Sequence, residues 1–204
     1  MKRVTLLTLA VLVLFAAVGC AKPPQDEQNA AQAELDRARQ ANADTWAPTE
    51  AKAAEESMSA AQAEISAQNQ KWMKNYDKAK ELLAQAKDGA AKAAEAAAAN
   101  KQQAKTDSEA AIAAADTAIQ TAEAALKTAP KTKDSAADLK LMENDLGTLK
   151  STLEAAKTAA GSEDYKKALE SANSVKDQAT SMATQIEEAK AKRAGAAHKP
   201  AAKK

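Results

Sequence analysis

The sequence predicts an all-α fold, and three observations predict it. Hydrophobic residues make up 45% of the 204 residues and aromatic residues only 2%, because most hydrophobic positions are alanine. Alanine, lysine, glutamate and glutamine all favour helices, and glycine and proline, which break them, number only five each. From residue 28 onwards, apolar residues recur at alternating spacings of three and four. We therefore expect elongated antiparallel helical hairpins, or a coiled-coil-like bundle, with alanine-rich seams.

The first nineteen residues predict a secretory signal. Lys2 and Arg3 give a short basic start, residues 4–18 form an uncharged apolar run, and Gly19 closes it with a small residue. This is the layout of a signal peptide. The run is shorter than the roughly 20 apolar residues that a membrane-spanning helix needs.

Ala17-Val18-Gly19-Cys20 makes this segment resemble the signals of bacterial lipoproteins, although that family usually has Leu where Ala17 stands. The resemblance implies cleavage before Cys20, a thioether-linked diacylglycerol on its sulfur, and a further acyl chain such as palmitate on the new N-terminus. Ala21, unlike an Asp there, implies export to the outer membrane, facing the periplasm. The alternative is an ordinary secreted protein with a free thiol at Cys20, which would be a liability in an oxidising compartment.

The pattern divides the rest of the chain into four parts. Residues 20–28 are polar, contain two prolines and form a tether. A first helical hairpin region covers residues 29–105, and a C-terminal helical bundle covers residues 106–189. Residues 190–204 are basic and broken by glycine and proline, which predicts a disordered tail.

Within the first region, the pattern predicts helices over residues 28–43 and 48–69, because Pro48 suits the first position of a helix. The period slips over residues 69–75, which predicts either a turn or a long helix whose buried face shifts. A third helix is expected from Tyr76 and loses its pattern in the alanine-rich stretch that follows.

Within the second region, Thr106 and Glu109 have capping-box spacing and indicate a helix that starts again and ends at Pro130. The strongest pattern lies in residues 134–189, where two apolar stripes flank Gly161. Because a short loop between two such helices makes them antiparallel neighbours, we expect a helical hairpin there.

Two stretches of the chain match each other. Tyr76-Asp77-Lys78-Ala79-Lys80-Glu81 is similar to Tyr165-Lys166-Lys167-Ala168-Leu169-Glu170, and Lys87-Asp88 matches Lys176-Asp177 at the same offset. We interpret them as two copies of one hairpin.

A family resemblance rests on two of these motifs. Trp46-Ala47-Pro48, followed by Tyr76-x-x-Ala79 with Leu82-Leu83, is similar to a bacterial domain family of unknown function found in small envelope lipoproteins. The likeness covers residues 31–97 and implies no known activity. Gly161-x-x-x-Tyr165-x-x-Ala168 also resembles a helix of the tetratricopeptide repeat, but the 34-residue period of that repeat is missing.

The residue types that catalysis needs are scarce. His198 is the single histidine and Cys20 the single cysteine, so we expect no metal site, no cofactor and no enzymatic activity. The formal net charge of +1, with both signs interleaved, argues against a nucleic-acid-binding body.

Two function classes remain open. The first is a lipid-anchored structural or protein-interaction module of the bacterial envelope, able to oligomerise through its alanine-rich seams. The second is a periplasmic ligand- or peptide-binding helical module of tetratricopeptide type. In the second class, the four aromatic residues of the mature chain would line a groove; they are Trp46, Trp72, Tyr76 and Tyr165.

Residues 190–204 carry six basic residues and no acidic one. Three interpretations stay open: a solvated solubilising tail; electrostatic contact of Lys199, Lys203 and Lys204 with peptidoglycan, lipid phosphates or an envelope protein; and covalent linkage through Lys204. The last rests on a resemblance of Lys204 to the terminal lysine of peptidoglycan-linked lipoproteins.

Deleting residues 193–204 distinguishes the three interpretations in a co-sedimentation assay with purified peptidoglycan. Electrostatic contact predicts that deletion reduces sedimentation at low salt and has no effect at high salt, since exposed charges are screened beyond about 8 Å at physiological ionic strength. Covalent linkage predicts a fraction that resists boiling detergent until muramidase treatment. Unchanged sedimentation would leave only the solubilising tail.

Overall fold

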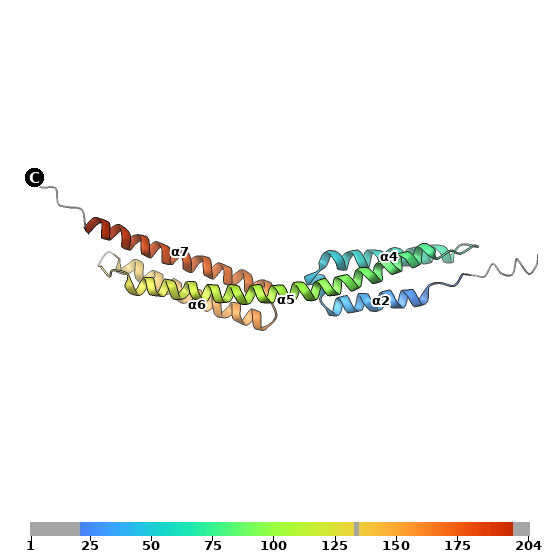
Figure 1. Cartoon of the computed structure of the whole chain (residues 1–204), viewed down its shortest axis with the longest axis horizontal. Coiled ribbons are helices and arrows are strands. Elements are labelled where there is room, and N and C mark those ends of the chain that lie inside the picture. The colour runs from blue at the N-terminus through green and yellow to red at the C-terminus, as the bar shows by residue number, and fades with distance from the viewer. Residues whose placement is uncertain (1–20, 133–134, 198–204) are drawn as a thin grey trace, which may run out of the picture. The chain divides into compact units, whose positions relative to one another are not determined.

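The computed structural model describes residues 21–132 and 135–197, and all regular structure in these ranges is helical (Figure 1). The prediction of an all-α fold is confirmed. The helices are α2 (Gln25–Gln40), α3 (Ala43–Trp46), α4 (Pro48–Asn69), α5 (Asp77–Thr128), α6 (Ala136–Gly161) and α7 (Tyr165–Ala197). Packing divides the chain into two units, with the boundary between Asn100 and Lys101, inside α5.

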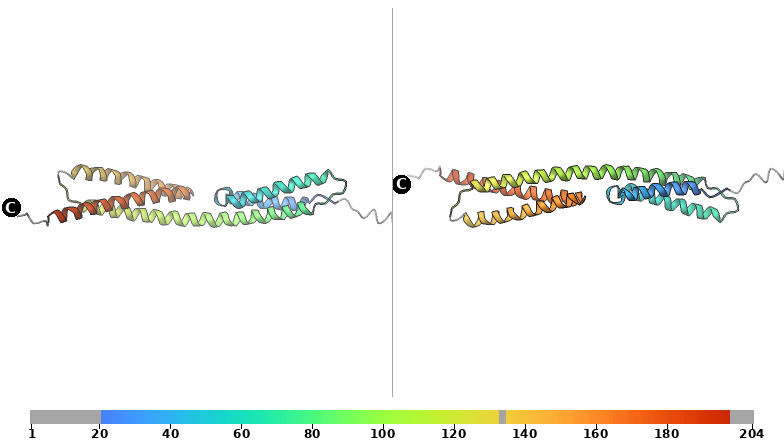
Figure 2. Two further views of the ribbon diagram at one scale, coloured as in Figure 1. Left: turned by 90° about the horizontal axis from the view of Figure 1, so that it is seen from above. Right: turned by 90° about the horizontal axis from the view of Figure 1, so that it is seen from below.

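Unit 1 contains α2, α3, α4 and the first part of α5 (Figure 2). Arg39 near the end of α2 pairs with Glu55 in α4, so these helices run antiparallel. The side chain of Asn100 donates a hydrogen bond of 2.7 Å to the carbonyl of Trp46, just before α4, so α5 also runs antiparallel to α4. The first turns of α2 and α5 therefore lie at the same end of this unit.

Unit 2 contains the second part of α5 with α6 and α7. Glu123 in α5 pairs with Lys150 in α6. Lys190 in α7 donates a hydrogen bond to the hydroxyl of Thr128 at the end of α5, so α5 and α7 run parallel, with α6 antiparallel to both. Each unit is thus built around three long helical segments that follow one another in the sequence.

The core of unit 1 consists mainly of alanine, and about half of the buried core residues of unit 2 are alanine. In unit 1 the larger buried side chains are Leu35, Met58, Ile65, Tyr76 and Leu83, and the rest of the cluster is alanine. An alanine methyl contributes only about 0.8 kcal/mol on burial, so the helices must approach closely to gain many contacts. At Gly89 of α5 the two helices lie close together, because a Cβ atom there would lie 3.3 Å from the Cβ of Ala54 in α4.

The two units bury the same pattern of positions along their last helices. Every buried residue of α5 in unit 1 has a buried counterpart in α7, 89 positions later. The pairs are Ala79 and Ala168, Leu83 and Ala172, Ala86 and Val175, Ala90 and Ala179, Ala93 and Met182, Ala94 and Ala183, and Ala97 and Ile186. Tyr76 and Tyr165, which precede or begin these helices, are also buried at the same offset.

Several helix boundaries match the expectation and others differ. Helix α4 has the expected limits, and residues 70–76 form a connection rather than a continued helix. Helix α2 begins at Gln25, inside the segment expected to be a tether. Helices α6 and α7 form the expected hairpin, which starts at Ala136 and ends beyond the expected limit at residue 189.

The largest difference is that α5 does not stop and restart near Thr106. The hydroxyl of Thr106 donates to the carbonyl of Gln102, and the hydroxyl of Ser108 donates to the carbonyl of Lys105. Both side chains therefore bond to the preceding turn of α5 instead of capping a new helix. Alanine's helix propensity carries the backbone through the stretch where the apolar pattern fades.

Helix α7 also extends further than expected. It continues to Ala197, past Lys190, where the sequence predicted the disordered tail to begin. Lys190 bonds to Thr128, and Arg193 donates to the hydroxyl of Thr132 at 3.2 Å, so the first part of that segment contacts the unit. Residues 198–204 lie outside the described ranges.

The α6–α7 connection shows that Gly161 does not end its helix by a left-handed backbone. That conformation occurs at Glu163, with φ of 63°. The amide of Asp164 donates to Ala159 at 2.9 Å and that of Glu163 to Ala160 at 3.1 Å, which is the bonding of a Schellman motif. Three residues therefore suffice to reverse the chain.

Two glycines test the importance of close helix approach. We expect Gly89→Val to lower the free energy of unfolding by about 1–3 kcal/mol, because added carbons would collide with α4. The matched control is Gly147→Ala in α6, where an added Cβ meets nothing within 4 Å. It should raise the free energy of unfolding by about 0.5–1 kcal/mol, the usual gain over glycine inside a helix. Denaturant unfolding measures both, and equal effects of the same sign would contradict the packing described here.

Candidate functional site

The residues predicted to carry function lie outside the described ranges. Cys20, the expected lipid attachment site, immediately precedes Ala21, the first described residue. Lys199, Lys203 and Lys204, the expected envelope-polymer contacts, follow the last described residue. What the structure does define is the part of the molecule to which Cys20 is covalently joined.

Only four residues separate Cys20 from α2. The amide of Gln25 donates to Pro23 at 2.8 Å and that of Gln28 to Pro24 at 3.0 Å, so the chain enters the helix directly after the prolines. Pro24 is buried although its neighbours are exposed. A chain spans at most about 3.6 Å per residue, so Cys20 lies within about 18 Å of Gln25 whatever its conformation.

The start of α2 shares one end of unit 1 with the α4–α5 connection, and we call this the tether end (Figure 1). Lys80 in the first turn of α5 pairs with Glu27 in the first turn of α2, at 3.8 Å. Lys78 pairs with Glu64 near the end of α4, at 3.7 Å. Because α2 and α5 run in the same direction, the residues that precede Lys80 and those that precede Glu27 lie toward the same end of unit 1.

Polar side chains fix the base of the α4–α5 connection. The buried Tyr76 donates its hydroxyl hydrogen to the Oδ1 atom of Asn69 at 2.6 Å. The amide of Asn75 donates to the Oε1 atom of Gln68 at 3.2 Å. Gln68 in turn donates to Glu64 at 2.7 Å. These bonds hold both ends of the connection against the helices.

Between these fixed ends, residues 71–74 form an exposed tip with the sequence Lys-Trp-Met-Lys. The tip presents apolar side chains to solvent: Trp72 is 98% exposed and Met73 is 71% exposed. Sequence reasoning did not single out this pair as a feature. The signal that could have found it is the slip in helical period at residues 69–75, since an aromatic residue that leaves the buried stripe loses its place in the core.

The three aromatic residues of unit 1 do not line one groove. Tyr76 is 3% exposed and packs in the core of unit 1, and Tyr165 is 7% exposed in unit 2. Trp46 is half-buried against the core of unit 1, before the start of α4, whereas Trp72 follows the end of that helix. The 22 residues of α4 span about 33 Å, so the two tryptophans are far apart.

The hollows of unit 2 are shallow surface grooves. One of about 960 Å³ runs between α5 and α7 and is floored mainly by alanine and threonine, such as Ala118 and Thr180. Another of about 570 Å³ lies between α6 and α7, beside the exposed Leu141. Within residues 21–132 and 135–197, no three His, Cys, Asp or Glu side chains are grouped as a metal site would need.

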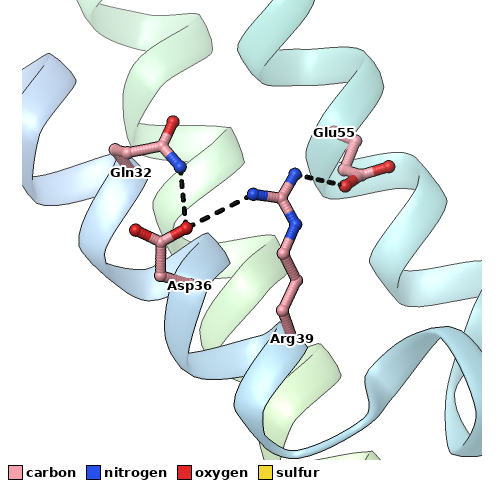
Figure 3. A network of polar contacts seen from close by, with 4 residues as sticks. All are labelled: Gln32, Asp36, Arg39 and Glu55. Atoms are coloured by element: carbon pink, nitrogen blue, oxygen red, sulfur yellow. Dashed lines mark hydrogen bonds and ion pairs between the residues drawn. The ribbon is translucent and has the colours of Figure 1, made fainter.

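Charged side chains on the helix surfaces form exposed ion pairs and small networks. In unit 1, Arg39 donates to Glu55 at 2.7 Å and to Asp36 at 3.3 Å, and Gln32 donates to the same Asp36 oxygen (Figure 3). The bond to Glu55 raises the pKa of Arg39, as does the carboxylate of Asp36. Because these groups are exposed, the network adds little stability.

Three glutamates are held in their charged form by neighbouring donors. Bonding to Lys150 lowers the pKa of Glu123, and bonding to Lys101 lowers the pKa of Glu163. The pKa of Glu64 is lowered chiefly by the hydrogen bond from Gln68. A folded-state pKa below the unfolded value means that stability is gained above the unfolded pKa and lost as the pH falls through the folded one.

A scan against models of protein families found no match to this chain, and neither did searches of curated proteins or of solved structures. Among the described residues, no helix combines the length and apolar character required to cross a bilayer.

The lowered pKa values predict a modest loss of stability in acid, beginning below the ordinary glutamate pKa of 4.5. Glu123→Gln should reduce the unfolding midpoint at pH 7, and its difference from wild type should be smaller at pH 3, since the wild-type carboxylate loses its charge as the pH falls through its lowered pKa. Glu170→Gln, an exposed change on α7, is the matched control and should shift neither. A difference between Glu123→Gln and wild type that is the same at both pH values would contradict the assigned pairing.

Proposed function

We propose that this protein is a lipid-anchored lipoprotein of the bacterial envelope, outer-membrane-bound and facing the periplasm. Its helical units act as a structural or protein-interaction module without catalytic activity. The observation that carries the proposal is Cys20, placed directly after a basic start, an apolar run and small residues. A diacylglycerol on the cysteine and an acyl chain on its amino group supply the two lipid signals that stable anchoring requires.

The short tether supports this proposal. With Cys20 within about 18 Å of Gln25, acyl chains on the cysteine would keep the first turn of α2 close to the membrane surface. Helix α2 begins with Asp26 and Glu27 in its first turn, which favours its N-terminus electrostatically. The helix therefore forms directly after the anchor.

An interaction role agrees with the surfaces of the units. Alanine seams bring helices close together and leave shallow grooves, so a partner would contact helix faces rather than enter a deep pocket. The ligand-binding alternative depended on an aromatic groove, and the separation of Trp46 from Trp72 removes its main argument. The basic residues after α7, Lys199 among them, would add electrostatic contact with peptidoglycan or lipid phosphates.

We also propose that the two units are copies of one ancestral hairpin. The support is the shared 89-residue offset, at which the sequence matches around Tyr76 and Tyr165 coincide with identical burial along α5 and α7. Alanine-rich sequences match by chance easily, whereas a complete correspondence of buried positions is more demanding.

The lipid anchor is tested by the mass and location of the mature protein. We expect intact mass spectrometry to show an N-terminus at Cys20 carrying acyl chains, and the protein to fractionate with membranes. Cys20→Ser should release it into the soluble envelope fraction. The control Ala21→Ser changes the adjacent residue and should leave lipid and location unchanged. An unmodified mature chain, or one beginning elsewhere, would refute the proposal.

A further inference from the structure

The tip of the α4–α5 connection exposes an aromatic side chain, whereas Tyr76 and Tyr165 are buried. The sequence has only two tryptophans, and one of them, Trp72, is 98% exposed next to a methionine that is 71% exposed. Closing a hairpin does not require such a tip. The α6–α7 connection reverses the chain with Ser162-Glu163-Asp164, which is acidic and contains no aromatic residue.

The charged residues of the tip itself have one sign. Lys71 and Lys74 flank the apolar pair and both are exposed. Residues 70–76 contain no acidic residue. One cation on each side of the apolar pair suits the surface of an anionic membrane. Indole rings prefer the headgroup level of a bilayer, and lysines interact with lipid phosphates.

The tip also lies where a membrane would be. It belongs to the tether end of unit 1, which the Glu27–Lys80 and Glu64–Lys78 pairs define. Cys20 is confined to within about 18 Å of Gln25 at this same end. The hydrogen bonds from Tyr76 and Asn75 to Asn69 and Gln68 hold the base of the connection at this end of the unit.

We propose that residues 71–74 insert into the lipid headgroup region of the membrane that holds the protein, as a second, non-covalent contact beside the acylated Cys20. This inference rests on the proposed lipid anchoring. Trp72 and Met73 enter the boundary between headgroups and acyl chains, and Lys71 and Lys74 contact anionic headgroups. Two points of attachment restrict the tilt of unit 1 on the membrane, which a single flexible anchor does not.

Depth-dependent fluorescence quenching tests the insertion directly. The mature acylated protein is reconstituted in vesicles of zwitterionic and anionic phospholipids, with or without brominated acyl chains. Trp46→Phe leaves Trp72 as the only tryptophan, and Trp72→Phe leaves Trp46 as a matched control. We expect a blue-shifted emission for Trp72 and quenching severalfold stronger than that of Trp46. Equal quenching of the two residues would overturn the proposal.

A second measurement does not depend on the acyl chains or on replacing Trp46. The mature chain with Cys20→Ser should bind anionic vesicles weakly and in a salt-sensitive way. Lys71→Gln with Lys74→Gln should weaken this binding about fivefold per lysine, which corresponds to about 1 kcal/mol for each basic residue near the surface. The control pair Lys87→Gln and Lys92→Gln lies on the exposed face of α5 and should bind like the parent. Equal loss in both pairs would overturn the proposal.

The two proposals fail separately. A mature chain without acyl groups would refute the lipid anchor, and the vesicle binding of the Cys20→Ser chain would still test the tip. An acylated chain with unquenched Trp72 would refute only the insertion. An emission shift that appears without vesicles and grows with protein concentration would assign the tip to a second copy of this chain, and would also refute the insertion.

Discussion

Close contact between alanine faces is the interaction on which both units depend. Side chains this small contribute little each, so stability accumulates only when backbones approach and many methyl groups touch. Larger residues lie among them: Leu83 and Val175 are fully buried, and the core of unit 2 also contains buried leucines of α6. The same constraint explains why glycine is tolerated inside a helix at residue 89, where α5 meets Ala54, and why the surface grooves are shallow.

The dependence on close packing also determines which polar features are permitted. Charged residues remain on the outer faces, where pairs such as Arg39–Glu55 and Lys101–Glu163 connect neighbouring elements. Buried polar groups occur inside α5, where the hydroxyl of Ser108 donates to the carbonyl of Lys105, and at the base of one connection. Gln68 and Tyr76 reach into the base of the α4–α5 connection, and each has a hydrogen-bond partner there. Both bonds serve to position the exposed residues between them.

The sequence predicted the elements that begin or end with distinctive residues. Pro48 and the period slip after Asn69 defined α4, and two regular apolar stripes defined the α6–α7 hairpin. Prediction failed where alanine made neighbouring positions alike, because residues 90–104 gave no stripe to follow and Thr106 imitated a helix cap. The exposure of Trp72 could not be predicted from residue type, since tryptophan is usually buried and only its three-dimensional neighbours decide its environment. The expected functional residues at either end of the chain lie outside the described ranges.

That each unit consists of helical segments consecutive in the sequence has a consequence for how the chain acquires its structure. Most contacts join residues close along the chain, which is the topology of rapid folding, because little loop-closure entropy is lost before native contacts form. All residues of unit 1 have left the ribosome once residue 100 has, so the core of this unit can assemble while the rest of the chain is still being synthesised. The second part of α5 would then emerge as the extension of a helix already nucleated, which removes the slowest step in starting the next unit.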